Sequence, residues 1–210
     1  ESRRCCVGAE TGSDAAGDPN PFLIEATVRI EGPGGQIFEV PAYFDGDGRG
    51  GLGGNVWKVR FSAGETGRWR FQVRSETESL DGHSGSFQLV DRRADDAPGV
   101  YRYGRLRFVG KPYLQFAEGP FWLKGGADSP ENFLGTALGD WERKRAEIDY
   151  LAEQEVNCVY IMTNNIRGDG RDVWPWLGDI ENDARANHQR FDVARLRRWQ
   201  NFFEHTQARG

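Results

Sequence analysis

The hydrophobic pattern of this 210-residue chain changes near residue 120, and that change constrains its fold more than any other feature. Before it, apolar and polar residues alternate, as in Ala26–Ile30, and a period of two is typical of half-buried strands. After it, apolar residues recur at helical spacing over residues 140–154, and a continuous apolar run follows at Val156–Met162. The sequence therefore predicts a β-rich first part followed by alternating strands and helices.

The first part contains five predicted strands separated by turns rich in glycine. They are centred on Phe22–Ile30, Phe38–Phe44, Trp57–Phe61, Trp69–Val73 and Phe87–Leu89. Short strands at even spacing favour an antiparallel β-sandwich with an immunoglobulin-like architecture, which we assign to residues 21–92. Residues 1–20 show no periodicity, and we expect them to form a disordered or irregular arm.

The second part begins after a polar boundary near residue 92. We expect residues 93–120 to form a linker with short β-hairpins. Residues 121–210 are expected to form two β/α units, in the order strand, loop, helix, strand, loop, helix. The predicted strands are Tyr101–Tyr103, Leu106–Val109, Tyr113–Ala117, Phe121–Leu123 and Val156–Met162, and Asp192 is the predicted N-cap of the last helix. Two β/α units are too few for an eight-stranded α/β barrel, which needs ~250 residues. The sequence thus predicts an incomplete TIM barrel, and we expect the chain to be the N-terminal part of a longer protein.

Composition narrows the possible partners. The net charge is −5 and no basic block is interleaved with aromatic residues, so a nucleic-acid partner is not predicted. No apolar run approaches the roughly 20 residues that span a membrane. The spacing of Cys5, Cys6 and Cys158 does not predict a zinc site, and Asp45-Gly46-Asp47-Gly48 lacks the later glutamate of a calcium loop. We therefore expect neither a metal nor a cofactor.

The candidate functional residues follow the two predicted strands of the barrel. They are Lys124, Asp128, Glu131 and Asn132 after the first strand, and Asn164, Asn165, Trp174 and Trp176 after the second. The carboxyl ends of parallel barrel strands carry the functional loops, so these side chains are expected at one edge. Asparagine amides both donate and accept hydrogen bonds, and indoles offer an apolar face with a polar edge. The alternatives are an ordinary asparagine turn for Asn164 and Asn165, and capping of a loop or helix start by Asp128, Ser129 or Asn132.

The segment Lys124–Leu134 (KGGADSPENFL) resembles the first barrel strand of a bacterial group of glycoside hydrolases, in which a β-sandwich of unknown function precedes a TIM barrel. Shorter segments that match in order are Asn20–Phe22, Val40–Gly48, Trp57–Phe61, Gly67–Trp69, Gly82–Phe87 and Asp172–Pro175. Two features depart from the group: residues 1–18 do not resemble its opening strand, and the loop between Leu134 and Trp141 is shorter.

The resemblance implies a secreted, periplasmic or cell-surface protein that acts on a carbohydrate. It further implies a retaining mechanism, with an acid/base after the fourth barrel strand and a nucleophile after the seventh. Neither strand belongs to this chain, so the resemblance assigns it no catalytic residue. Asp128 and Glu131 share one loop, whereas the two carboxyl groups of a glycosidase flank the scissile bond roughly 5–5.5 or 6.5–9.5 Å apart. Substrate contact or loop bracing is therefore the favoured role for these two carboxylates.

Two classes of function remain open from the sequence. The first is a fragment of a glycoside hydrolase that acts on a polysaccharide or oligosaccharide. The second is a non-catalytic carbohydrate-binding or adhesive module, in which the β-sandwich recognises the sugar. A polysaccharide lyase is less favoured, because its base and charge-neutralising groups find no candidates.

Overall fold

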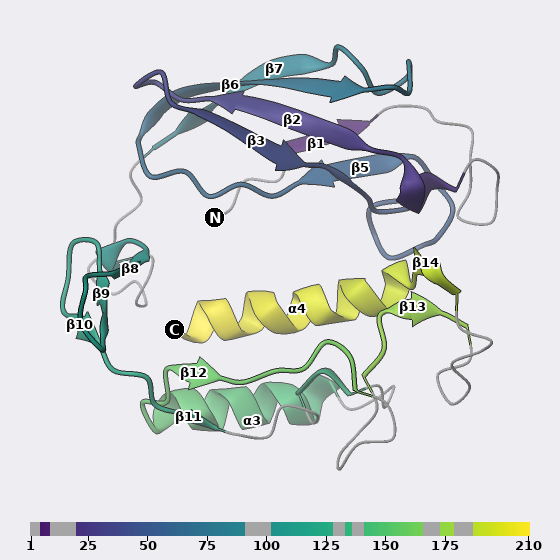
Figure 1. Cartoon of the computed structure of the whole chain (residues 1–210). Coiled ribbons are helices and arrows are strands. Elements are labelled where there is room, and N and C mark those ends of the chain that lie inside the picture. The colour runs from purple at the N-terminus through teal and green to yellow at the C-terminus, as the bar shows by residue number, and fades with distance from the viewer. Residues whose placement is uncertain are drawn as a thin grey trace. The chain divides into compact units, whose positions relative to one another are not determined.

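A computed structural model describes residues 5–8, 20–90, 102–127, 133–135, 141–165, 173–178 and 187–210. The chain divides into two compact units, one made of Glu1–Asp91 with Asn187–Arg197 and the other of Arg92–Ala186 with Arg198–Gly210. Figure 1 shows that the described part of the chain is mostly β-sheet, together with the helices α3 and α4.

The first unit contains a four-stranded antiparallel sheet in the order β3-β2-β6-β7. Its strands are β2 (Ala26–Glu31), β3 (Ile37–Pro41), β6 (Gly67–Ser75) and β7 (Ser84–Leu89). In β2 the residues Ala26, Val28 and Ile30 are buried, while those between them are partly exposed. The predicted alternation of inward-facing and outward-facing residues along this strand is therefore confirmed. Phe22, which was predicted to extend the same strand, lies instead in the short 3₁₀ helix η1 (Pro21–Leu23).

A second antiparallel sheet of the first unit has the order β1-β5-β4. Its strands are β1 (Cys5–Gly8), β4 (Tyr43–Phe44) and β5 (Val56–Val59). The prediction of an irregular arm over residues 1–20 is wrong for β1, which pairs with β5 from Cys5 opposite Val59 to Gly8 opposite Val56. Four residues are too few to show a readable period, and this strand is defined by its partner more than by its own sequence.

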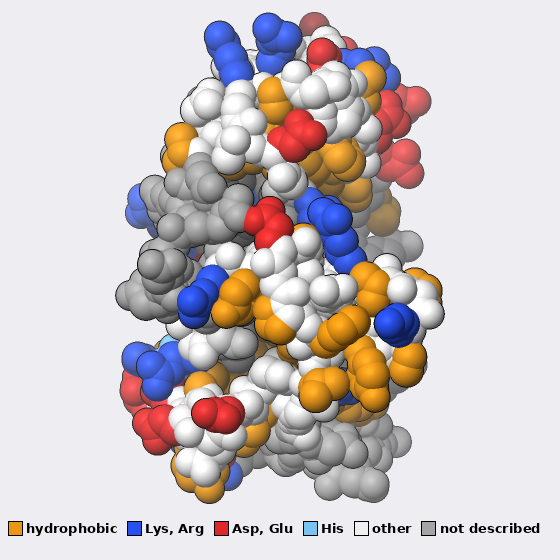
Figure 2. Space-filling view, turned by 90° about the vertical axis from the view of Figure 1, so that its left-hand side faces the viewer, with side chains coloured by type: hydrophobic (Ala, Val, Ile, Leu, Met, Phe, Trp, Pro, Cys, Tyr) orange, Lys and Arg blue, Asp and Glu red, His pale blue; other side chains and the backbone are white. Residues whose placement is uncertain are grey.

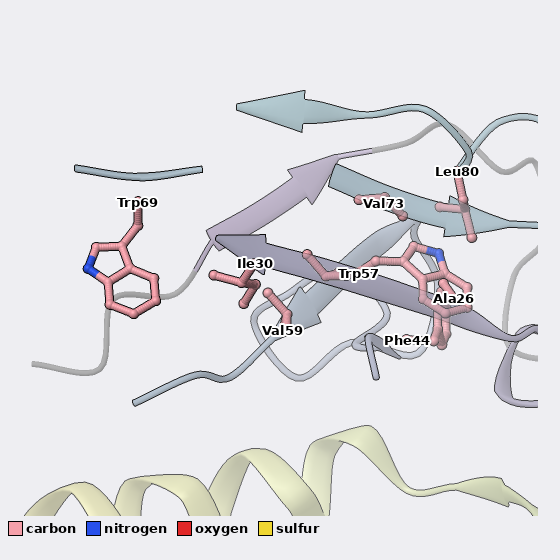
Figure 3. Packing of buried hydrophobic residues seen from close by; sticks show 9 residues of the cluster. Ala26, Ile30, Phe44, Trp57, Val59, Trp69, Val73 and Leu80 are labelled. Carbon is pink, nitrogen blue, oxygen red and sulfur yellow. The ribbon is translucent and has the colours of Figure 1, made fainter. Parts of the chain in front are cut away.

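Side chains from both sheets form one buried cluster, shown in Figure 3. The cluster consists of Ala26, Val28, Ile30, Phe44, Trp57, Val59, Trp69, Val73 and Leu80. Trp69 is fully buried, and its indole N–H donates to the Glu65 carbonyl at 3.1 Å, so its polar group is satisfied inside the core. Burial of each large apolar side chain stabilises the fold by about 1.5–3 kcal/mol.

The glycine-rich loop after β4 is held by two aspartates. Asp47 Oδ1 accepts hydrogen bonds from the backbone N–H groups of Arg49 at 2.7 Å and of Gly51 at 2.8 Å, and these bonds lower the pKa of Asp47 below its usual value. Asp45 forms an ion pair with the ammonium group of Lys58, a buried residue of β5. The two carboxylates are therefore engaged by groups of the chain itself.

The second unit begins with a small antiparallel sheet in the order β10-β9-β8. Its strands are β8 (Leu106–Phe108), β9 (Leu114–Phe116) and β10 (Phe121–Trp122). Phe121–Leu123 was predicted as the first barrel strand, and this is wrong, because Phe121 pairs with Gln115 and Trp122 with Leu114 in an antiparallel hairpin. Arg102 and Tyr103, predicted to be extended, are helical.

A parallel strand pair and a helix follow. The strands are β11 (Gly126–Ala127) and β12 (Cys158–Val159), and the helix between them is α3 (Trp141–Glu153), which confirms the helix predicted over residues 140–154. The apolar run Val156–Met162 forms a shorter strand than predicted, and Tyr160 is exposed. Within the described residues, β12 pairs with one strand, β11. The apolar run was expected to form a strand buried on both faces between neighbours, and the described residues do not provide that environment.

The last elements are β13 (Trp176–Leu177), β14 (Asn187–Phe191) and α4 (Val193–Arg209). The prediction that Asp192 caps α4 is confirmed, because Asp192 Oδ1 accepts from the Arg195 backbone N–H at 2.9 Å. Among the described residues, no helix is long and apolar enough to cross a membrane.

Helix α3 ends in a way that gives a testable prediction. Glu155 has a positive φ of 59°, the Glu155 N–H donates to the Ala152 carbonyl, and the Val156 N–H donates to the Leu151 carbonyl, which together form a Schellman motif. A glycine at Glu155 adopts this backbone without the side-chain penalty, so Glu155→Gly is expected to raise the free energy of unfolding by about 0.5–1 kcal/mol in urea denaturation. The matched variant Glu153→Gly, at the last residue of α3, is expected to lower it by up to about 1 kcal/mol. Destabilisation by both variants would contradict this prediction.

Candidate functional site

The candidate site of the second unit is built on the parallel pairing of β11 and β12. Gly126 lies opposite Cys158 and Ala127 opposite Val159, so the carboxyl ends of the two strands lie at one edge. A Cβ atom at Gly126 would lie 1.8 Å from the Cys158 carbonyl oxygen. The close backbone approach is therefore possible only for glycine, and one member of the Gly-Gly pair in the sequence has a defined structural role.

The amino ends of the same strands are joined by Asn157. Its Oδ1 accepts from the Gly125 N–H at 3.0 Å, and its Nδ2 donates to the Leu123 carbonyl at 2.8 Å. Lys124 lies between these two residues and is exposed. The structure thus places Lys124 before β11, at the amino end of the strand, and does not bring it together with the residues that follow the two strands.

Asp128, Glu131 and Asn132 lie outside the described residues. The chain is described again from Phe133, and both Phe133 and Leu134 are buried.

Two side chains from the helices hold this buried stretch in place. Trp199 of α4 donates its indole N–H to the Leu134 carbonyl at 3.2 Å, and Lys144 of α3 donates to the Gly135 carbonyl at 2.5 Å. Lys144 was missed as a functional candidate, although it is only 8% exposed. A lysine among the charged residues of an amphipathic helix carries no sequence signal of burial.

Asn164 and Asn165 follow β12, and the structure connects them to the tryptophan segment. Asn165 and Val173 form an antiparallel bridge, with N–H···O distances of 2.9 and 2.7 Å in the two directions. Trp174 directly follows Val173, so the bridge connects the start of the tryptophan segment to Asn165. Asn164 is exposed, and the buried Asn165 Nδ2 has no hydrogen-bond acceptor within the described part of the chain.

The two tryptophans have different environments. Trp174 is 1% exposed, whereas Trp176 is half-buried, and their rings meet edge to face with centroids 4.8 Å apart and planes at 73°. Trp174 is therefore a core residue that fixes the orientation of its neighbour, and the prediction of a two-tryptophan stacking surface is wrong for this member. Trp176 keeps the exposed area that a stacking residue needs.

The described residues supply binding groups more than reactive ones. Asn164 offers an exposed amide and Trp176 a partly exposed indole, whereas the amide nitrogen of Asn165 is buried. No cluster of three or more His, Cys, Asp or Glu side chains that could hold a metal ion occurs within the ranges that the structure describes. Such a set suits a polar ring with hydroxyl groups on its rim and an apolar face.

Comparison with known proteins gives one family match and one structural match. Residues 8–76, which include β2–β6 of the first unit, match the family model described as "Domain of unknown function (DUF5060)". No curated protein matches the chain. The chain is similar to the crystal structure of a protein from Bacteroides vulgatus described as a putative glycoside hydrolase, with 17% sequence identity and a TM-score of 0.74. The match covers 99% of this chain and 38% of that protein, so the two share a fold and the chain spans well under half of the other protein's length.

Proposed function

We propose that this chain is part of a carbohydrate-active enzyme, a retaining glycoside hydrolase that acts on a polysaccharide or oligosaccharide. The observation that carries the proposal is the shared fold over 99% of the chain with a protein described as a putative glycoside hydrolase. The parallel pairing of β11 and β12 supports it independently, because it sets the residues that follow both strands at one edge.

In this proposal the two units have different roles. The first is an accessory β-sandwich of immunoglobulin-like architecture, and the second holds the first two β/α units of a TIM barrel. The acid/base and the nucleophile belong to later strands outside this chain, so the chain alone is expected to bind sugar without turnover. An enzyme that degrades polysaccharides works where its substrate is, and we propose a secreted, periplasmic or cell-surface location.

The sugar contacts are assigned to the carboxyl-end edge of β11 and β12. Trp176 supplies the stacking face and the exposed amide of Asn164 binds hydroxyl groups, while Asn165, whose amide nitrogen is buried, positions the tryptophan segment through its bridge to Val173. Asp128, Glu131 and Asn132 belong to the same proposed edge by their position in the sequence directly after β11.

Substitution of Trp176 tests this assignment. Trp176→Ala is expected to weaken binding of the chain to its best ligand from a panel of neutral oligosaccharides by about tenfold, since aromatic stacking is worth about 0.5–1.5 kcal/mol beyond area burial. The measurement is isothermal titration calorimetry, with circular dichroism to verify folding.

The matched control is Trp141→Ala, which removes another half-buried indole of the second unit. Its affinity should stay within about twofold of the unsubstituted chain, because Trp141 lies at the start of α3 and packs edge to face on His205, with ring centroids 6.1 Å apart. Equal losses for the two variants would contradict a specific role for Trp176.

The alternative is a non-catalytic carbohydrate-binding module. One observation favours it: the family match lies entirely in the first unit. In that case the four-stranded or three-stranded sheet of the first unit holds the sugar, and Trp176→Ala leaves the affinity unchanged.

A further inference from the structure

The small sheet β8–β10 presents one face that combines aromatic and basic side chains. The register sets Arg107 opposite Gln115 and Gln115 opposite Phe121, and residues paired across strands point to the same side of a sheet. Tyr113 directly precedes β9 and Leu123 directly follows β10, so both lie at the margin of this face. The rings of Tyr113 and Phe121 meet edge to face with centroids 6.4 Å apart, which agrees with this placement.

This face is open to solvent. Tyr113 is 50% exposed, Phe121 47% and Leu123 63%. Figure 2, which looks onto the side where β8–β10 are drawn in Figure 1, shows a group of hydrophobic side chains beside basic ones. Aromatic groups gathered at the surface mark binding sites more often than scattered single residues do.

The charge of this segment is opposite to that of the chain. Between residues 102 and 127 there are five basic side chains, Arg102, Arg105, Arg107, Lys111 and Lys124, and one acidic side chain, Glu118. The whole chain has a net charge of −5. The Lys111 ammonium lies 5.9 Å from the centroid of the Phe121 ring, so a cation and an aromatic face are neighbours in the same patch.

We propose that the face formed by Arg107, Lys111, Tyr113, Phe121 and Leu123, the basic–aromatic face, binds an acidic polysaccharide. This rests on the proposed function and names a substrate class: sugars that carry carboxylate or sulfate groups. The exposed ring of Tyr113 contacts the apolar face of a sugar, and the cations of Arg107 and Lys111 pair with its anionic groups. Nucleic acid is the competing polyanion. Basic and aromatic residues do alternate over residues 102–113, contrary to the expectation from the sequence that no basic block is interleaved with aromatic residues. Single-stranded nucleic acids are bound along a basic groove that follows their backbone, whereas the two cations of this face lie at one small sheet.

The test is affinity electrophoresis and calorimetry of the full chain with polygalacturonate, alginate, neutral hydroxyethylcellulose and single-stranded DNA. Arg107→Gln combined with Lys111→Gln is expected to weaken binding to the acidic polysaccharide by about tenfold, and raised NaCl should weaken binding of the unsubstituted chain. Tyr113→Ala is expected to weaken it several-fold without changing the salt dependence.

The control variants carry the same chemistry elsewhere in the second unit. Arg198→Gln lies on α4, and Tyr150→Ala removes a tyrosine of α3 that is 61% exposed. Both are expected to bind acidic polysaccharide like the unsubstituted chain. Equal losses in test and control variants would overturn the proposal, as would DNA binding that is tighter and equally sensitive to the face variants.

The failure of this inference is distinguishable from failure of the proposed function. A chain that binds neutral oligosaccharides through Trp176 and ignores polygalacturonate and alginate keeps the proposed function and loses the acidic substrate class. If the chain binds acidic polysaccharide through the basic–aromatic face and Trp176→Ala does not change the affinity, the acidic substrate class is supported. The sugar site at the carboxyl-end edge of β11 and β12 is then contradicted.

Discussion

Replacing Lys58 by methionine is expected to lower the free energy of unfolding of the first unit by about 3 kcal/mol. The Lys58 side chain is 4% exposed and pairs with the Asp45 carboxylate, which is itself 16% exposed. The ammonium group also donates to the Gly48 carbonyl at 3.1 Å. Methionine preserves the length of the side chain and removes its charge, so Asp45 is left as a poorly solvated carboxylate without its counter-ion. Urea denaturation followed by tryptophan fluorescence measures the loss.

Two variants separate the buried pair from ion pairs in general. Arg74→Ala removes an ion pair with Glu39 in which both side chains are about 60% exposed, and it is expected to cost less than about 0.5 kcal/mol. Adding Asp45→Asn to Lys58→Met removes the orphaned charge and is expected to restore part of the stability. Equal effects of Lys58→Met and Arg74→Ala would show that the loop does not depend on its internal cation.

The second large effect is expected at Gly126. Gly126→Ala should disrupt the β11–β12 pair, because the new methyl group would lie 1.8 Å from the backbone oxygen of Cys158. A backbone oxygen in a strand pair cannot rotate away as a flexible side chain can, and overpacking of this kind costs about 1–3 kcal/mol or more. Thermal unfolding and near-ultraviolet circular dichroism, which reports the packing of the tryptophans, measure the change.

The adjacent glycine provides the control. A Cβ atom at Gly125 meets no atom within 4 Å, so Gly125→Ala is expected to stay within about 0.5 kcal/mol of the unsubstituted chain. A stable, unchanged Gly126→Ala variant would mean that β11 and β12 do not approach as described.

Secondary structure and burial could be predicted most reliably for strands with one face buried against a core. The alternation of Ala26, Val28 and Ile30 is confirmed in β2, because burial on one side imposes a period of two that the sequence must carry. The capping of α4 by Asp192 was predictable for a similar reason, since its interaction is local.

The errors have a common physical origin in short segments whose structure is set by a distant partner. Phe121–Leu123 is too short to distinguish a hairpin strand from a barrel strand, and its antiparallel pairing with β9 decides the outcome. Cys5–Gly8 becomes a strand through its pairing with β5. In both segments the hydrophobic pattern of the few residues involved does not determine the pairing partner.

In the candidate site, too, the sequence predicted the order of the residues along the chain but not their burial. Residue type and spacing placed Asn165 and Trp174 after the second parallel strand, and the Asn165–Val173 bridge brings these segments together. The sequence could not tell which of two tryptophans separated by one residue is covered, because burial depends on the surrounding fold. Nor could it show that Lys124 lies at the amino end of β11, since the true start of the strand is Gly126.

Hydrogen–deuterium exchange of the chain, with and without its best oligosaccharide ligand, tests directly whether carbohydrate binds at the edge of β11 and β12. We expect slower exchange in residues 158–165 and 173–178, with little change in residues 26–89. Protection confined to residues 26–89, with the edge unchanged, would contradict it and favour a binding module in the first unit.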